Sequence, residues 1–138
     1  MKLKFVYKVL PVFCFVQKAL VPSKYNAKNY GFFIAFDSKY SFNDVALIQH
    51  ELKHSKQFFR LPLLHSLLYR FSKEYRYKSE LEAYAVQLSN YSREEQFTLL
   101  DYFTKMIYTK YNLSGYKDYF EIMQDLEHEL QASFNTNK

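Results

Sequence analysis

The sequence predicts an α+β fold, with a small N-terminal antiparallel sheet followed by about five helices. Runs of β-branched and aromatic residues come first, and segments with apolar residues at helical spacing follow. The 138 residues include only two glycines and three prolines, which disfavours a fold with many tight turns. This length suits one domain, 1–138, with a strand-rich part over 1–40, central helices over 41–90 and C-terminal helices over 91–138.

Three strands are expected near the N-terminus. Residues on either side of Pro11 are β-branched and aromatic, which favours the half-buried surface of a sheet. Residues 26–30 are polar and predict a turn. Residues 31–36 predict another strand, which Asp37 and Ser38 end.

The first helix is expected to begin near Val45 and to end before Pro62, a length of about 15 residues. Ser41 and Asn43 are both plausible N-caps, and Asp44 would be favourable in the first turn. Its apolar residues fall near helical spacing: Val45, Leu47, Ile48, Leu52 and Phe59.

A second, amphipathic helix is expected over 63–71. Its apolar residues are Leu63, Leu64, Leu67, Leu68 and Phe71. The stretch 61–71, with Arg60, Arg70 and Lys73 at its ends, would also suit an anionic membrane surface. We favour packing into the core, because a small domain needs every apolar helix face that it has.

The rest of the chain predicts a link and three helices. Residues 74–79 form a charged, tyrosine-rich link. The third helix is expected over 79–88, with Ser79 as its cap and Glu80 and Glu82 in its first turn. Two further helices are expected near 93–111 and 117–133, separated by residues 112–115.

Composition excludes several classes of site. Two glycines are too few for a phosphate-binding loop or a dinucleotide fingerprint. The single cysteine, Cys14, excludes an intrachain disulfide and a cysteine-based zinc finger. Pro11 interrupts the N-terminal apolar run and no cleavage site follows, so we expect a cytoplasmic protein without a signal peptide or transmembrane segment.

The net charge of +5 is concentrated in residues 50–78, which contain seven Lys and Arg against two Glu, and also three of the four histidines. Basic residues interleaved with aromatic ones could contact nucleic acid, but no nucleic-acid-binding motif accompanies them. We therefore expect no nucleic-acid partner. A positive rim around a cleft that attracts acidic peptides is the preferred interpretation.

The most informative stretch is His50-Glu51-Leu52-Lys53-His54. Residues four apart lie on one face of a helix, so both imidazoles can reach one metal ion. Glu51 lies on the adjoining side of the same turn, where its carboxylate can act as a general base. This HExxH pattern predicts a zinc site, with His50 and His54 as two ligands.

A catalytic zinc usually has three protein ligands and one open position. His65, Glu80 and Glu82 are the candidates for the third ligand. We expect His65 to be a partly buried structural histidine, because it lies in an apolar helix. Glu80 is preferred over Glu82. The presence of Glu82 is explained without a metal, because the helix dipole favours an exposed acidic residue in the first turn.

HExxH on one helix, followed about 25 residues later by Glu80-Leu81-Glu82-Ala83, resembles the gluzincin metallopeptidases. The smallest of these, the minigluzincins and related phage or bacterial zincin-like proteins, are similar in size. Gln57 and the segment Tyr75-Arg76-Tyr77 also match features common in these families. The resemblance covers residues 31–88 and implies a zincin-like fold, a zinc cofactor, and Glu80 as the third ligand.

The resemblance implies a zinc metalloendopeptidase that hydrolyses peptide bonds. Glu51 would accept a proton from the attacking water. Tyr75, Arg76, Tyr77 and His65 are candidate donors to the oxyanion, and Tyr77 is preferred. Ligating histidines also need hydrogen-bond acceptors, for which Asp44 and Gln57 are both candidates.

Two other functions remain open at this point. The first is a catalytically inactive zincin-like protein that binds metal or a partner. The second is a basic, helical nucleic-acid-binding domain in which HExxH is accidental. The oligomeric state and the substrate do not follow from the sequence.

Overall fold

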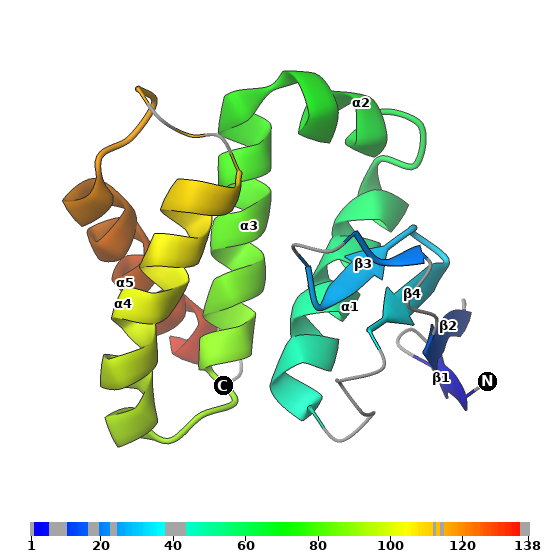
Figure 1. The fold of residues 1–138 in the computed structure, drawn as a ribbon, viewed down its shortest axis with the longest axis horizontal. Helices are drawn as coiled ribbons and strands as arrows, with labels where there is room; N and C mark the ends of the chain where they lie inside the picture. The colour runs from blue at the N-terminus through cyan, green and yellow to red at the C-terminus, as the bar shows by residue number, and fades with distance from the viewer. Residues whose placement is uncertain are drawn as a thin grey trace. The chain divides into compact units, whose positions relative to one another are not determined.

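The computed structural model describes residues 2–5, 11–16, 20–22, 25–37, 44–111, 113 and 115–135. Strands come first and helices follow within this part of the chain, which confirms the α+β fold (Figure 1). The chain divides into two compact units, Met1–Pro62 and Leu63–Lys138. A single domain over 1–138 stays a prediction.

The first unit contains a sheet with the strand order β1-β2-β4-β3. The strands are β1 (Lys2–Phe5), β2 (Pro11–Val16), β3 (Ala27–Asn29) and β4 (Phe33–Phe36). The β1–β2 and β3–β4 pairs are antiparallel, but β2 and β4 are parallel, so the sheet is mixed. The prediction of an antiparallel sheet is therefore wrong at this pair. β3 lies at the edge of the sheet, and a tight connection makes β4 antiparallel to it. β4 therefore lies between β3 and β2 and runs parallel to β2.

Residues 27–29 form strand β3, although 26–30 predicted a turn. An edge strand pairs on one side only and needs few apolar residues, so its sequence resembles that of a turn. Gly31 lies in the connection to β4 with a φ of +83°, a left-handed conformation that favours glycine.

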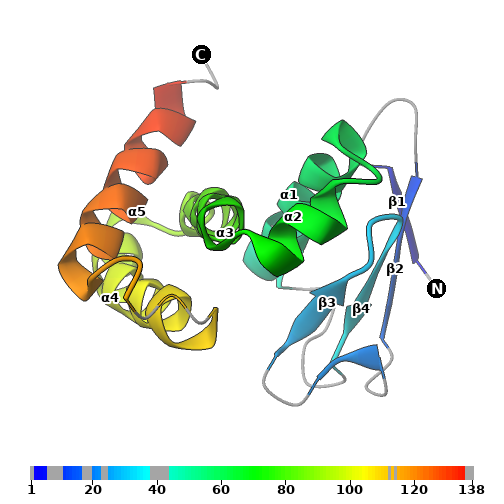
Figure 2. The same ribbon diagram turned by 90° about the horizontal axis from the view of Figure 1, so that it is seen from above.

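Helix α1 (Val45–Arg60) covers one face of this sheet (Figure 2). Its predicted bounds are confirmed. Buried apolar side chains of the sheet and of α1 form one cluster: Val12, Cys14, Ala27, Ile34, Phe36, Leu47, Ile48 and Leu52. The N-cap is Asp44, whose carboxylate accepts a hydrogen bond from the Leu47 amide at 2.9 Å. Asp44 is therefore the cap and not, as predicted, a residue of the first turn. The two predicted caps, Ser41 and Asn43, lie outside the described residues.

The second unit is helical and contains α2 (His65–Phe71), α3 (Lys73–Leu88), α4 (Arg93–Lys110) and α5 (Tyr119–Asn135). Helices α3, α4 and α5 pack against one another, and consecutive helices run in opposite directions (Figure 1). Leu88, Ile107, Ile122 and Leu126 are completely buried and form part of this core. The two C-terminal helices lie close to their predicted positions.

Helix α3 begins six residues earlier than predicted. Its N-cap is Ser72, whose hydroxyl accepts a hydrogen bond from the Tyr75 amide at 3.1 Å. Glu74 lies in the first turn and forms an ion pair with Lys78 at 2.7 Å. The predicted link over 74–79 is therefore helical, and Ser79 is not a cap. Glu80 lies in the interior of a helix rather than at its start.

The apolar residues of α2 and the turn before it do not all pack into the core, contrary to prediction. Leu63, Leu64, Leu67 and Phe71 are exposed. The opposite side of α2 carries the buried His65, which contacts α3 through Tyr75. Only one side of this short helix is therefore used for packing. Within the described ranges, no helix has both the length and the apolarity to cross a membrane.

Candidate metal site

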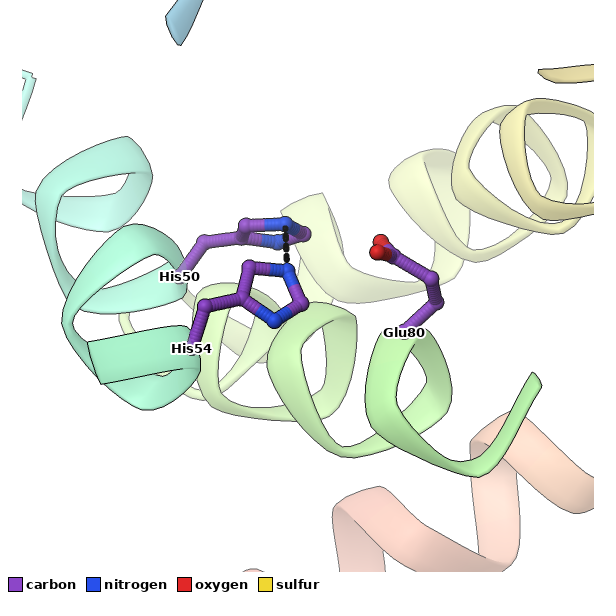
Figure 3. Close-up of side chains that lie close together, drawn as sticks. All are labelled: His50, His54 and Glu80. Carbon is purple, nitrogen blue, oxygen red and sulfur yellow. Dashed lines mark hydrogen bonds between the residues drawn. The ribbon is translucent and has the colours of Figure 1, made fainter. Parts of the chain in front are cut away.

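Helix α1 places His50 and His54 one turn apart on the same face. Both side chains are buried, with 4% and 9% of their surface exposed. Their rings meet edge to face, and the two Nε2 atoms lie 3.2 Å apart, as the dashed line in Figure 3 marks. The sequence prediction that these imidazoles share one face is confirmed.

The distance between the two Nε2 atoms suits a shared zinc ion. Two nitrogen ligands at about 2.05 Å from zinc, with a tetrahedral angle between them, lie about 3.3 Å apart. The observed 3.2 Å agrees with this value. The two imidazoles could therefore bind one zinc ion without a change of backbone.

Gln57 determines which nitrogen of His54 is available. Its Oε1 lies 2.9 Å from His54 Nδ1, and Gln57 is itself buried. An amide oxygen only accepts hydrogen bonds, so Nδ1 carries the proton and Nε2 keeps its lone pair. His50 Nε2 then donates to His54 Nε2. A cation between them would replace that proton, with His50 protonated at Nδ1.

This contact distinguishes the two candidate acceptors that the sequence left open. Gln57 lies one turn after His54 and accepts from its ring. Asp44 instead caps α1. Gln57 is therefore the acceptor for the His54 ring, and Asp44 is the N-cap of the helix.

Glu51 is buried, with 7% of its surface exposed. Its backbone carbonyl accepts a hydrogen bond from Asn29 Nδ2 at 2.6 Å, and the same nitrogen donates to Ser55 Oγ at 2.8 Å. Asn29 Oδ1 accepts from the Gly31 amide at 2.6 Å. The side chain of Asn29 therefore joins strand β3 to α1 by hydrogen bonds at and just after the HExxH segment. No sequence pattern pointed to Asn29, because it lies in a segment that predicts a turn.

In the second unit, Glu80 lies in the interior of α3 and is 1% exposed (Figure 3). The Tyr69 hydroxyl, from α2, donates a hydrogen bond to Glu80 Oε1. Burial, and secondarily the charge of Glu80, raises the pKa of Tyr111 well above its ordinary value. A carboxylate this buried is stable as an anion only where hydrogen bonds or a cation compensate its charge. Sequence analysis did not identify Tyr69.

The other two candidate ligands also lie in the second unit. Glu82 is partly exposed on α3. His65 Nδ1 lies 2.8 Å from the hydroxyl of Tyr75, and the two rings meet edge to face. This contact agrees with the structural role expected for His65.

Tyr77 and Arg76 make contacts that stabilise the second unit. The Tyr77 hydroxyl donates to Asp125 on α5 at 2.6 Å, and burial together with this carboxylate strongly raises the pKa of Tyr77. Arg76 donates to the backbone carbonyls of Tyr69 and Tyr111. A catalytic role for Tyr77 stays a prediction.

The structure thus brings together His50, His54, Gln57 and Glu51 in the first unit. Glu80 and its tyrosine partner belong to the second unit, and the approach of Glu80 to the histidine pair is part of the proposal below. In comparisons with known proteins, the chain matches no family model, no curated protein and no solved structure.

Proposed function

We propose that this protein is a zinc-dependent metallopeptidase of the gluzincin type, in which His50, His54 and Glu80 hold the zinc ion. The observation that carries the proposal is the histidine pair. The two Nε2 atoms are separated by a distance typical of two ligands on one tetrahedral zinc, and Gln57 selects the tautomer that zinc requires.

The donor set supports zinc over harder cations. In the proposed site each of the three residues supplies one ligand atom, an imidazole nitrogen or a carboxylate oxygen. Two imidazoles and one carboxylate are typical of catalytic zinc, whereas calcium and magnesium prefer oxygen ligands. The buried carboxylate of Glu80 would gain a compensating positive charge.

Zinc bound there would supply a Lewis acid that acidifies water and polarises a peptide carbonyl. Glu51, next to His50 on α1, accepts the proton of the attacking water and passes it to the leaving amine. Tyr77 is the proposed donor to the oxyanion.

The proposed substrate is a peptide or protein with acidic character. Residues 50–78 carry the whole net charge of the chain, and several of their cations are exposed, among them Lys56, Arg70 and Lys73. A local positive field raises the concentration of anionic substrates and speeds their association. Cleavage of an acidic peptide should therefore slow more steeply with added salt than cleavage of a neutral one.

Zinc binding is tested first, by calorimetry and by metal analysis of purified protein. We expect one zinc per chain, lost in His54→Ala. Glu80→Ala should weaken binding far more than Glu82→Ala, its neighbour on α3. Gln57→Ala should weaken binding about tenfold or more, because a ligating histidine loses its orienting acceptor. Gln49→Ala, at an exposed position of the same helix, is the matched control.

Hydrolysis is tested with a mixed peptide library and Glu51→Gln. This variant should keep zinc and lose cleavage, which would assign the general base to Glu51. Residual cleavage equal to that of the original chain would refute that assignment. Zinc binding without any cleavage would instead favour an inactive zincin-like protein. Absence of zinc, combined with tight binding of oligonucleotides, would favour the nucleic-acid alternative.

Tyr77→Phe tests the proposed oxyanion donor. If Tyr77 acts in catalysis, kcat falls while zinc affinity stays the same. If it only joins α3 to α5, loss of the hydrogen bond to Asp125 lowers stability by about 1–2 kcal/mol and leaves kcat unchanged. Tyr75→Phe provides the comparison, since its hydroxyl contacts His65 instead.

A further inference from the structure

Helix α2 and the turn before it present an apolar surface to solvent. Leu63 and Phe71 are 87% and 75% exposed, and Leu64 and Leu67 are more than half exposed. Positions 64, 67 and 71 follow helical spacing, so their side chains lie on one side of the helix. We call these four residues the outer face of α2. Large apolar side chains gathered in this way mark an interaction surface.

The outer face is held in place by the rest of the second unit. Arg76, on α3, donates to the backbone carbonyls of Tyr69 and Arg70 in the last turn of α2, at 2.9 and 3.1 Å. Its Nε also donates to the Tyr111 carbonyl at 3.2 Å, after the end of α4. On the inner side, His65 contacts Tyr75. The apolar side chains are therefore presented by an anchored helix.

Most of the charges around this face are positive. Residues 52–73 contain five Lys and Arg and no Asp or Glu, and the next residue, Glu74, forms an ion pair with Lys78. Arg70 and Lys73 flank Phe71 and are exposed, and the Arg70 guanidinium lies 5.6 Å from the centre of the Phe71 ring. Arg60 precedes the face by three residues. Whatever binds here would meet apolar side chains with cations at their edge.

Two other exposed phenylalanines lie closer in sequence to acidic residues. Phe97 on α4 is 74% exposed but follows Glu94 and Glu95 in the sequence. Phe120 on α5 is also exposed and precedes Glu121. Apolar exposure alone therefore does not distinguish α2, but its combination with the net positive charge of residues 52–73 does.

We propose that the outer face of α2 binds the surface of an anionic phospholipid bilayer. The four apolar side chains enter the headgroup region, and Arg70 and Lys73 contact lipid phosphates. Basic residues beside exposed leucine and phenylalanine are the composition of interfacial membrane-binding segments. A stable protein interface needs about 20–30 residues from each partner, far more than one two-turn helix supplies. The proposal does not depend on zinc or on peptidase activity.

The test is flotation of the full chain with vesicles of phosphatidylcholine, with and without about one third phosphatidylserine. We expect binding to the anionic vesicles only, and weaker binding at high salt. Leu67→Ser combined with Phe71→Ser should lower partitioning about tenfold or more. Arg70→Glu combined with Lys73→Glu should lower it at least as much, since each basic residue contributes about fivefold.

Phe97→Ser is the matched control, because it removes an equally exposed phenylalanine from a helix with acidic neighbours. It should leave partitioning unchanged, and circular dichroism should show that all variants remain folded. Equal binding to both kinds of vesicle, or an equal loss in Phe97→Ser, would refute the proposal. An absence of vesicle binding would also refute the proposal. This holds even if Leu67→Ser and Phe71→Ser abolish self-association or binding to an acidic protein, because the outer face would then bind protein and not lipid.

Discussion

Replacing Asn29 by alanine is expected to loosen the HExxH helix from the sheet. Asn29 lies on the edge strand β3, and its side chain makes three hydrogen bonds. Nδ2 donates to the Glu51 carbonyl and to Ser55 Oγ, and Oδ1 accepts from the Gly31 amide. The first two bonds join β3 to α1, and the third shapes the connection to β4.

The magnitude follows from these contacts. Each hydrogen bond contributes about 1 kcal/mol to stability, so their loss in Asn29→Ala should lower the free energy of unfolding by about 3 kcal/mol. Ser55 is completely buried, so water cannot easily take the place of the amide beside it. Asn29→Asp keeps the acceptor for Gly31 but places a charge against the Glu51 carbonyl, and should be no more stable than the alanine variant.

The assay is urea unfolding, combined with hydrogen exchange of the α1 amides. Exchange should accelerate around Ser55 in Asn29→Ala and change little in α4. Asn90→Ala is the control, because Asn90 is exposed and makes a single side-chain bond, to the Val86 carbonyl at 2.7 Å. A loss below about 1 kcal/mol in Asn29→Ala, or one equal to that in Asn90→Ala, would refute the assignment of Asn29 as the link between sheet and helix.

Two further variants test the local structure of each unit. Gly31→Ala should lower the free energy of unfolding by more than about 1 kcal/mol, because the residue has a φ of +83° and the new Cβ would lie 2.8 Å from the Phe58 ring. Urea unfolding measures this loss, and an unchanged midpoint would contradict the geometry. In the capping box of α4, the backbone amide and then the hydroxyl of Ser92 lower the pKa of Glu95 below its ordinary value. This stabilisation is present above the unfolded pKa and is lost as the pH falls through the folded value. Ser92→Ala should therefore lower the melting temperature at pH 7, with a smaller difference at pH 3; a difference that grows on acidification would contradict this.

Local sequence was sufficient to predict α1 and its histidine pair. The bounds of α1 follow from apolar spacing and from Pro62, and both are properties of neighbouring residues. The four-residue spacing of His50 and His54 fixes their common face once the helix forms. Strand β3 and the start of α3 were missed, because an edge strand and a charged, tyrosine-rich first turn both resemble loops in composition.

Periodicity within a few turns of the chain is thus enough to predict the α+β fold, the helix that carries HExxH and the common face of its two imidazoles. The tertiary structure was needed to show that Asn29 joins the motif to the sheet and that one side of α2 remains exposed. These outcomes depend on which polar atom reaches which partner across the fold. Residue type and spacing along the chain leave that choice open, because several side chains of suitable chemistry compete for each contact.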